Sequence, residues 1–165
     1  MEDYYKKILE AEVYEVAKIT PLEKANNLSK TLNNNIYLKR EDLQDVFSFK
    51  IRGAFNKMRQ LPKTQLANGV ITSSAGNHAQ GVALSALKLN CNATILMPKT
   101  TPLVKVKAVR NLRANVILFG DNYDDSYKEA LRLSEEKNLS FIHPFDDPEV
   151  IAGQGTIAIE IEQQL

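Results

Sequence analysis

The 165-residue chain has one cysteine, two histidines and no tryptophan. A single cysteine, Cys91, allows no internal disulfide, which favours a reducing compartment. So few thiol and imidazole groups also give no metal-ligand cluster. The excess of charge is small too, since 21 Lys and Arg stand against 20 Asp and Glu and leave a net charge of +1. This balance gives no electrostatic reason to expect binding to nucleic acid or to an anionic membrane.

Long apolar runs are also missing. No stretch is long enough to cross a bilayer, and the first residues, MEDYYKK, lack the apolar core of a signal peptide. The composition, with 44% hydrophobic and 25% charged residues, is typical of a globular protein rather than a disordered one. We therefore expect a protein of the cytoplasm.

From residue 48 onward, short apolar segments alternate with helical patterns. Strands are expected at 69–72, 92–97, 115–119 and 139–142, with helices between them. This alternation predicts an α/β fold in which an open parallel four-stranded sheet carries helices on both faces. Before it we expect helices at 4–9 and 22–32 and a strand at 36–38. A last helix is expected within 149–164, starting near Gly155.

Residues 48–54 (SFKIRGA) place Lys50 where an extended segment turns into a helix, with Ser48 expected as the N-cap. The positive end of the helix dipole and burial both disfavour the lysine ammonium, so a free amine is easier to reach. Such an amine can form a Schiff base with an aldehyde, and Phe49 beside it offers apolar surface to a flat ring. Taken alone, however, the pattern also describes an ordinary exposed lysine on an amphipathic helix.

A second unusual segment, residues 73–81 (SSAGNHAQG), lies between a strand pattern and a helix pattern. Small residues ahead of a helix leave backbone N–H groups free to bind an anion such as a substrate carboxylate. Asn77 either donates one oriented hydrogen bond to a ligand or caps its own helix, and the spacing does not decide between the two. His78 has no acidic partner at local spacing, which favours a structural hydrogen bond over a role as a base.

Together the two segments resemble the fold-type-II pyridoxal-phosphate enzymes, and most closely the biosynthetic threonine deaminases (threonine dehydratases) of the isoleucine pathway. Residues 20–22 (TPL), 38–44 (LKREDLQ), 144–148 (PFDDP) and 151–156 (IAGQGT) add to a likeness that runs from about Tyr5 to the last residue. The resemblance implies a smaller α/β domain at residues 48–148. It assigns residues 1–47 to an N-terminal segment of a larger domain and 149–165 to the first helix returning to that domain.

The resemblance also implies a role for each matching residue. Lys50 would hold pyridoxal 5′-phosphate through a Schiff base and then act on the α-proton of the substrate. Phe49 would flank the pyridine ring, and Asn77 would hydrogen-bond the 3′ oxygen of the cofactor. The substrate carboxylate would be bound by the backbone N–H groups of Ser74, Ala75, Gly76, Asn77 and His78. The implied reaction is the dehydration and deamination of L-threonine to 2-oxobutanoate and ammonia, with no metal.

The family holds the cofactor phosphate with a glycine-rich loop, for which the sequence has no match. The resemblance thus implies the N-terminal portion of a homo-oligomeric enzyme, truncated and poorly active by itself. Three alternatives remain open at this point. They are a catabolic dehydratase acting on serine or threonine, a serine racemase, and a non-catalytic α/β module that binds amino acids.

Overall fold

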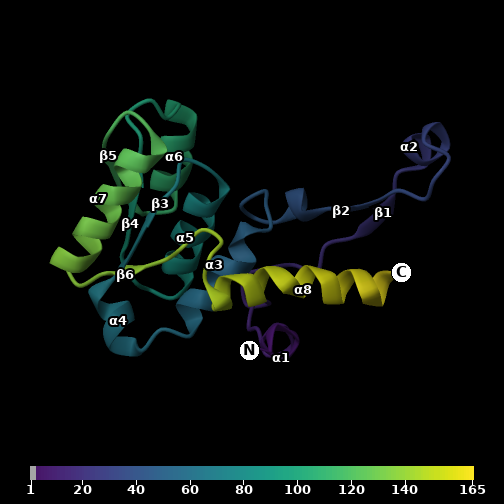
Figure 1. The fold of residues 1–165 in the computed structure, drawn as a ribbon, viewed down its shortest axis with the longest axis horizontal. Helices are drawn as coiled ribbons and strands as arrows, with labels where there is room; N and C mark the ends of the chain where they lie inside the picture. The colour runs from purple at the N-terminus through teal and green to yellow at the C-terminus, as the bar shows by residue number, and fades with distance from the viewer. Residues whose placement is uncertain (1–2) are drawn as a thin grey trace.

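The central sheet has four parallel strands, as the sequence predicts. The computed structural model describes residues 3–165. Its strands are β3 (Val70–Ser73), β4 (Ala93–Met97), β5 (Asn115–Leu118) and β6 (Ser140–Phe141). They lie in the order β5-β4-β3-β6, and every pairing in the sheet is parallel (Figure 1).

Helices cover both faces of this sheet because its side chains alternate between them. On one face, Ile71 and Leu96 pack against α7 (Tyr123–Glu136). On the other, Val70 and Ile95 belong to the core formed with three helices. These are α3 (Lys50–Arg59), α5 (Asn77–Lys88) and α6 (Leu103–Asn111). The predicted architecture is confirmed. A short helix that we did not expect, α4 (Lys63–Asn68), leads into β3.

An arm precedes the sheet lobe, which is the four-stranded sheet with α3 to α7. Apart from its first helix, which packs against the last helix of the chain, the arm extends away from the lobe (Figure 1). It contains α1 (Tyr4–Leu9), β1 (Leu22–Lys24), α2 (Asn26–Thr31), β2 (Tyr37–Lys39) and the 3-10 turn η1 (Glu41–Leu43). The prediction of one helix across residues 22–32 is wrong, because β1 pairs antiparallel with β2 and only the second half of the segment is helical. Pairing with a strand distant in sequence has outweighed the local helical pattern.

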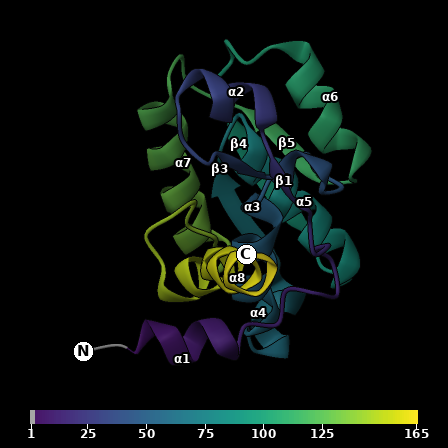
Figure 2. The ribbon, with the colours of Figure 1, turned by 90° about the vertical axis from the view of Figure 1, so that its right-hand side faces the viewer.

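The last helix, α8 (Pro148–Gln164), lies alongside the arm, and Figure 2 looks along its axis. Its predicted start near Gly155 is wrong. The helix begins seven residues earlier because the Asp147 carboxylate accepts hydrogen bonds from the backbone N–H groups of Glu149 and Val150, while Pro148 occupies the first turn. Gly153 lies inside the helix, where a Cβ would come within 2.7 Å of the Arg52 carbonyl oxygen. The glycine therefore marks a close helix crossing and not a helix start.

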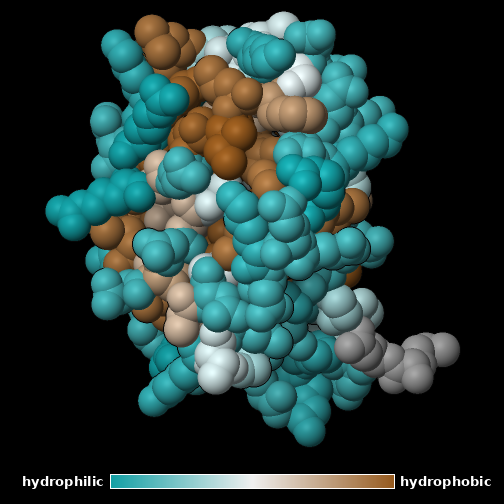
Figure 3. Space-filling view, turned by 90° about the vertical axis from the view of Figure 1, so that its left-hand side faces the viewer, coloured by the Kyte–Doolittle hydropathy of each residue, from teal (hydrophilic) through white to brown (hydrophobic). Residues whose placement is uncertain are grey.

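The side of the lobe turned away from the arm carries a group of apolar side chains (Figure 3). The exposed apolar residues of β5 and α7 include Leu118 and Leu131. Over residues 3–165, the helices are too short or too polar to pass through a lipid bilayer.

Candidate active site

The order in which strands are added to the sheet reverses between β3 and β6, although all four run parallel. From β3 the chain continues to β4 and β5 on one side, whereas β6 is added on the other side. In open α/β sheets, ligands bind outside the carboxyl ends of the strands at such a switch point. Both loops that follow β3 and β6, residues 74–76 and 142–147, lie at this position. The switch point thus brings the loop before α5 and the loop after β6 to one edge of the sheet.

Lys50 reaches this edge from the start of α3. Its Nζ donates a hydrogen bond of 2.7 Å to the carbonyl oxygen of Pro144, in the loop after β6. Partial burial lowers the pKa of the Lys50 amine. The Nζ also lies 5.4 Å from the centroid of the Phe49 ring, which is 39% exposed. An amine that deprotonates more readily therefore lies beside an accessible aromatic face.

Ser48 is not the N-cap of α3, contrary to our prediction. The capping position is occupied by Phe49, which already has helical backbone angles, and no side chain among the described residues caps the helix. The Ser48 hydroxyl instead accepts a long hydrogen bond of 3.4 Å from the Lys50 N–H. The turn that carries Lys50 is thus poorly stabilised by its own sequence.

The second segment packs directly against the Lys50 backbone. A Cβ at Gly81 of α5 would lie 3.0 Å from the Lys50 carbonyl oxygen and 3.2 Å from the Ile51 nitrogen. The missing side chain lets α5 approach α3 at the residue that carries the amine. This contact gives the glycine at the end of the second segment a physical reason.

The loop before α5 presents several backbone donors. The Ser74 N–H is already engaged with the Leu96 carbonyl, and the Ser74 hydroxyl accepts a hydrogen bond from Gly76. Within residues 3–165, the N–H groups of Ala75, Asn77 and His78 have no acceptor. A Cβ at Gly76 would meet nothing within 4 Å, so the space next to these donors is open. The N-terminus of α5 can therefore accept an anion.

Asn77 and His78 differ in their surroundings. The exposed Asn77 side chain does not cap α5 and has no hydrogen-bond partner in the described part of the chain, so it is free to meet a ligand. The His78 Nε2 lies 3.1 Å from the Ile142 carbonyl oxygen, to which it must donate. Burial lowers the pKa of His78 to about 4, so the ring is neutral at pH 7. His78 thus ties α5 to the end of β6, the structural hydrogen bond expected from the sequence.

The site fits a pyridine aldehyde such as pyridoxal phosphate. Lys50 supplies a half-buried amine, Phe49 an aromatic face, and Asn77 a free amide, while the open space at Gly76 leaves room beside them. No group of three or more His, Cys, Asp or Glu side chains in residues 3–165 is placed to hold a metal ion.

Two contributions to this edge have no signal in the sequence. The carbonyl of Pro144 that binds Lys50 is a backbone group, and the His143 Nδ1 accepts the N–H groups of Phe145 and Asp146 to shape the same loop. A backbone acceptor has no side-chain signature, and the pairing spans 94 residues. Only the fold could reveal it.

Known proteins are similar to this chain in both sequence and fold. The family described as "Pyridoxal-phosphate dependent enzyme" matches residues 13–165. The biosynthetic L-threonine dehydratase of Burkholderia multivorans is 60% identical over 165 residues, which cover 98% of this chain and 32% of that protein. The chloroplastic biosynthetic threonine dehydratase of Arabidopsis thaliana is 59% identical over 162 residues, covering 98% of this chain and 27% of that protein.

Among solved structures, the processed form of threonine deaminase isoform 2 from Solanum lycopersicum superimposes with a TM-score of 0.95 at 56% identity. The match covers 98% of this chain and 45% of that one. The chain spans about a third of the length of the curated relatives, 32% and 27% in the two cases above. The family match covers nearly the whole chain, and the Lys50 site fits the cofactor that the family is named for. The chain therefore belongs to the pyridoxal-phosphate dependent enzymes, in agreement with the resemblance found in its sequence.

Proposed function

We propose that this chain provides the lysine-bearing part of a threonine dehydratase, which converts L-threonine to 2-oxobutanoate and ammonia for isoleucine biosynthesis. The observation that carries the proposal is the position of the Lys50 amine, at the switch point and on the same edge as the open N-terminus of α5. The choice of threonine is supported by the names of relatives at 60% and 59% identity.

The Lys50 amine would hold the cofactor and later move a proton. When bound, pyridoxal phosphate supplies an electron sink for bond breaking at the α-carbon of the substrate. Burial lowers the pKa of Lys50, which raises the fraction of neutral amine able to bind the aldehyde carbon and to accept the α-proton. Phe49 would cover one face of the ring, and the Asn77 amide would donate to its 3′ oxygen.

The substrate carboxylate would bind at the N-terminus of α5. The free N–H groups of Ala75, Asn77 and His78 are its donors, with the Ser74 hydroxyl beside them and the open space at Gly76 admitting it. His78 contributes its backbone there, while its buried ring holds the end of β6. This arrangement would fix the substrate by its carboxylate and leave its side-chain hydroxyl free to depart.

The organisation of the whole enzyme is proposed on the same basis. Residues 48–148 contain the entire four-stranded sheet and would form the smaller domain, whereas the arm (1–47) and α8 (149–165) would belong to the larger one. The enzyme would be a homo-oligomer. We propose the cytoplasm as its location, although the Arabidopsis relative is named as chloroplastic.

The attachment site is tested by trapping. The chain is incubated with pyridoxal phosphate, reduced with borohydride and mapped by mass spectrometry. We expect the pyridoxyl group on Lys50 in preference to the other lysines. Lys50→Ala should lose it, whereas Lys57→Ala, on the same helix but paired with Asp147, should retain it. Equal labelling of all lysines in the unaltered chain would refute Lys50 as the attachment point.

Catalysis is tested in a hybrid enzyme, because the chain spans 32% of the Burkholderia relative. These 165 residues replace the matching segment of that protein, and formation of 2-oxo acid is measured with L-threonine and L-serine. We expect activity with a preference for threonine, and its loss on Lys50→Ala. A folded hybrid that binds amino acids without turnover would favour a non-catalytic module, and a preference for serine would favour a serine enzyme.

A further inference from the structure

Arg52, two residues after Lys50 in α3, is completely buried and lies between two carboxylates. Its Nε and Nη2 donate hydrogen bonds of 2.8 Å to the two oxygens of Glu41. Its Nη1 and Nη2 donate at 2.6 and 3.1 Å to the two oxygens of Glu160. Nη1 also reaches the Thr156 hydroxyl, and Nη2 reaches the Lys18 carbonyl. The guanidinium fork is therefore used on both sides.

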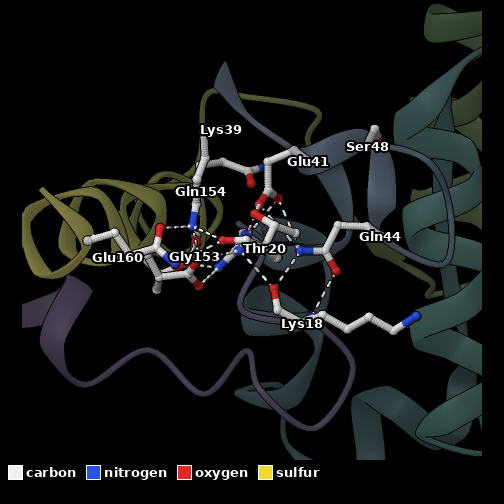
Figure 4. Close-up of polar contacts among 12 residues, drawn as sticks. Lys18, Thr20, Lys39, Glu41, Gln44, Ser48, Gly153, Gln154 and Glu160 are labelled. Atoms are coloured by element: carbon white, nitrogen blue, oxygen red, sulfur yellow. Dashed lines mark hydrogen bonds and ion pairs between the residues drawn. The ribbon is translucent and has the colours of Figure 1, made fainter. Parts of the chain in front are cut away.

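The surrounding groups complete a neutral cluster, in which side chains from the arm and α8 converge (Figure 4). The Lys39 Nζ lies 2.6 Å from Glu160 Oε2 and also donates to the Thr20 carbonyl. Glu41 accepts further hydrogen bonds from the Thr20 hydroxyl and the Gln44 amide. Arg52 and Lys39 thus balance Glu41 and Glu160, and the described carboxylate oxygens all have partners.

This cluster joins the helix that carries Lys50 to structure outside the sheet lobe. Glu41 comes from η1, Lys39 from β2, and Glu160 from α8. The first turn of α3 needs such contacts, since the Phe49 side chain does not cap it and the neighbouring Ser48 hydroxyl accepts only a long hydrogen bond from the Lys50 N–H. The N–H of Gly53 is likewise bonded to the Gln154 side chain of α8. Contacts from other elements, rather than the local sequence, hold this turn in place.

A buried ion cluster adds little net stability compared with apolar packing of the same volume, and in some proteins its role is to fix one geometry. We propose that Arg52 is a positioning residue that fixes the first turn of α3, and with it the Lys50 amine, relative to α8 and the arm. The functional meaning of this position rests on the proposed role of Lys50. The geometric claim itself is independent of any cofactor and can be measured without one.

The test replaces Arg52 by Lys in the 165-residue chain, which keeps the charge and removes the fork. Two controls accompany it. Arg59→Lys alters an arginine on the same helix whose partners, Glu12 and Glu15, are exposed. Val109→Ala removes buried volume from the sheet core and lowers stability without touching the cluster. Amide hydrogen exchange in the first turn of α3 is measured, together with reductive methylation of Lys50 by formaldehyde and cyanoborohydride.

We expect Arg52→Lys to speed exchange at Gly53 and Ala54 and to raise the methylation rate of Lys50 severalfold relative to the other lysines. Neither control should change this ratio. An unchanged ratio in Arg52→Lys, or an equal change in Val109→Ala, would overturn the proposal, because a merely structural contact acts only through global stability. If Arg52→Lys does not fold, Glu160→Gln is measured in the same way and decides by the same criteria.

Pyridoxal phosphate serves as a second probe, and its capture at Lys50 should fall in Arg52→Lys but not in Arg59→Lys. If the unaltered chain captures none at Lys50, the proposed function of Lys50 fails. The exchange and methylation results still judge Arg52 in that case, so the two failures are distinguishable.

Discussion

The crossing of α3 and α8 makes Gly153→Ala the most direct test of how the lysine helix is held. A Cβ at Gly153 would lie 2.7 Å from both the Arg52 carbonyl oxygen and the Gly53 Cα. Both are backbone atoms and cannot rotate away. Ordinary contact begins at 3.4 Å, so the new methyl group falls 0.7 Å short of the room it needs. The two helices must therefore move apart.

Two opposing effects set the size of the change. Alanine gains about 1 kcal/mol over glycine in a helix interior. Overpacking against rigid neighbours costs about 1–3 kcal/mol, and each hydrogen bond lost from a charged group costs roughly 1.5–3 kcal/mol more. Separation would lengthen the Arg52 bonds to Glu160 and Thr156, which already measure up to 3.1 Å. We expect a net loss of about 2 kcal/mol, equivalent to a fall in Tm of roughly 4–8 °C for a chain of this length.

Thermal and urea unfolding of the Gly153→Ala chain and the unaltered chain measure this loss. Gly76→Ala is the matched control. A Cβ at Gly76 meets nothing within 4 Å, so this substitution should leave stability unchanged or slightly improved. A Gly153→Ala chain as stable as the unaltered one would refute the close crossing. It would mean that the helix propensity of alanine outweighs the steric cost and that a methyl group fits between α3 and α8.

Three further predictions concern the edge of the sheet. His78 has a pKa of about 4 in the folded chain against 6.5 in the unfolded chain, so the unfolded state binds the proton more readily. The free energy of unfolding should therefore fall by about 3 kcal/mol as the pH drops from 6.5 to 4. Urea unfolding measured across this pH range should show the fall, and His78→Gln should remove it. Gly81→Ala places a methyl group 3.0 Å from the Lys50 carbonyl oxygen and should displace the Lys50 amine. The borohydride-trapped adduct should then form about tenfold more slowly. An unchanged rate would show that the contact at Gly81 does not position the amine. Asn77→Ala should weaken binding of pyridoxal phosphate while leaving the trapped group on Lys50, and equal affinity would remove Asn77 from the proposed site.

The sheet lobe was predictable because its signals are local and repeated. Each strand of the sheet is a short apolar run, and each lies within two residues of its predicted ends. Once four such runs alternate with helices, the handedness of the connections leaves few arrangements. The arm gave weaker signals. Its strand β1 has three residues and exists only because β2, more than ten residues later, pairs with it. A local pattern cannot report such a partner.

Glycine was the residue most easily misinterpreted. The prediction that the last helix starts near Gly155 is wrong, since α8 runs through that glycine. In α8 the glycines instead mark crossings, since Gly153 touches α3 and a Cβ at Gly155 would collide with the Ile8 side chain. Gly81 follows the same rule on the other side of Lys50. The cost in propensity is offset by tertiary contact, which becomes visible only when the neighbouring helix is in place.

The candidate site shows the same division between local and distant information. The motif around Lys50 identifies an amine at a helix start, and the segment around Asn77 identifies a helix end with free donors. Neither motif indicates why an uncapped turn should stay in position. The answer lies in Arg52, whose partners Thr156 and Glu160 are 104 and 108 residues away, and an arginine carries no sequence mark of burial because the residue type is usually exposed. A segment that matches the motif but lacks the Glu41 and Glu160 pair would therefore place the same lysine on a less ordered turn. Recognition of the motif predicts which residue reacts, whereas the buried cluster determines whether that residue is held where it can react.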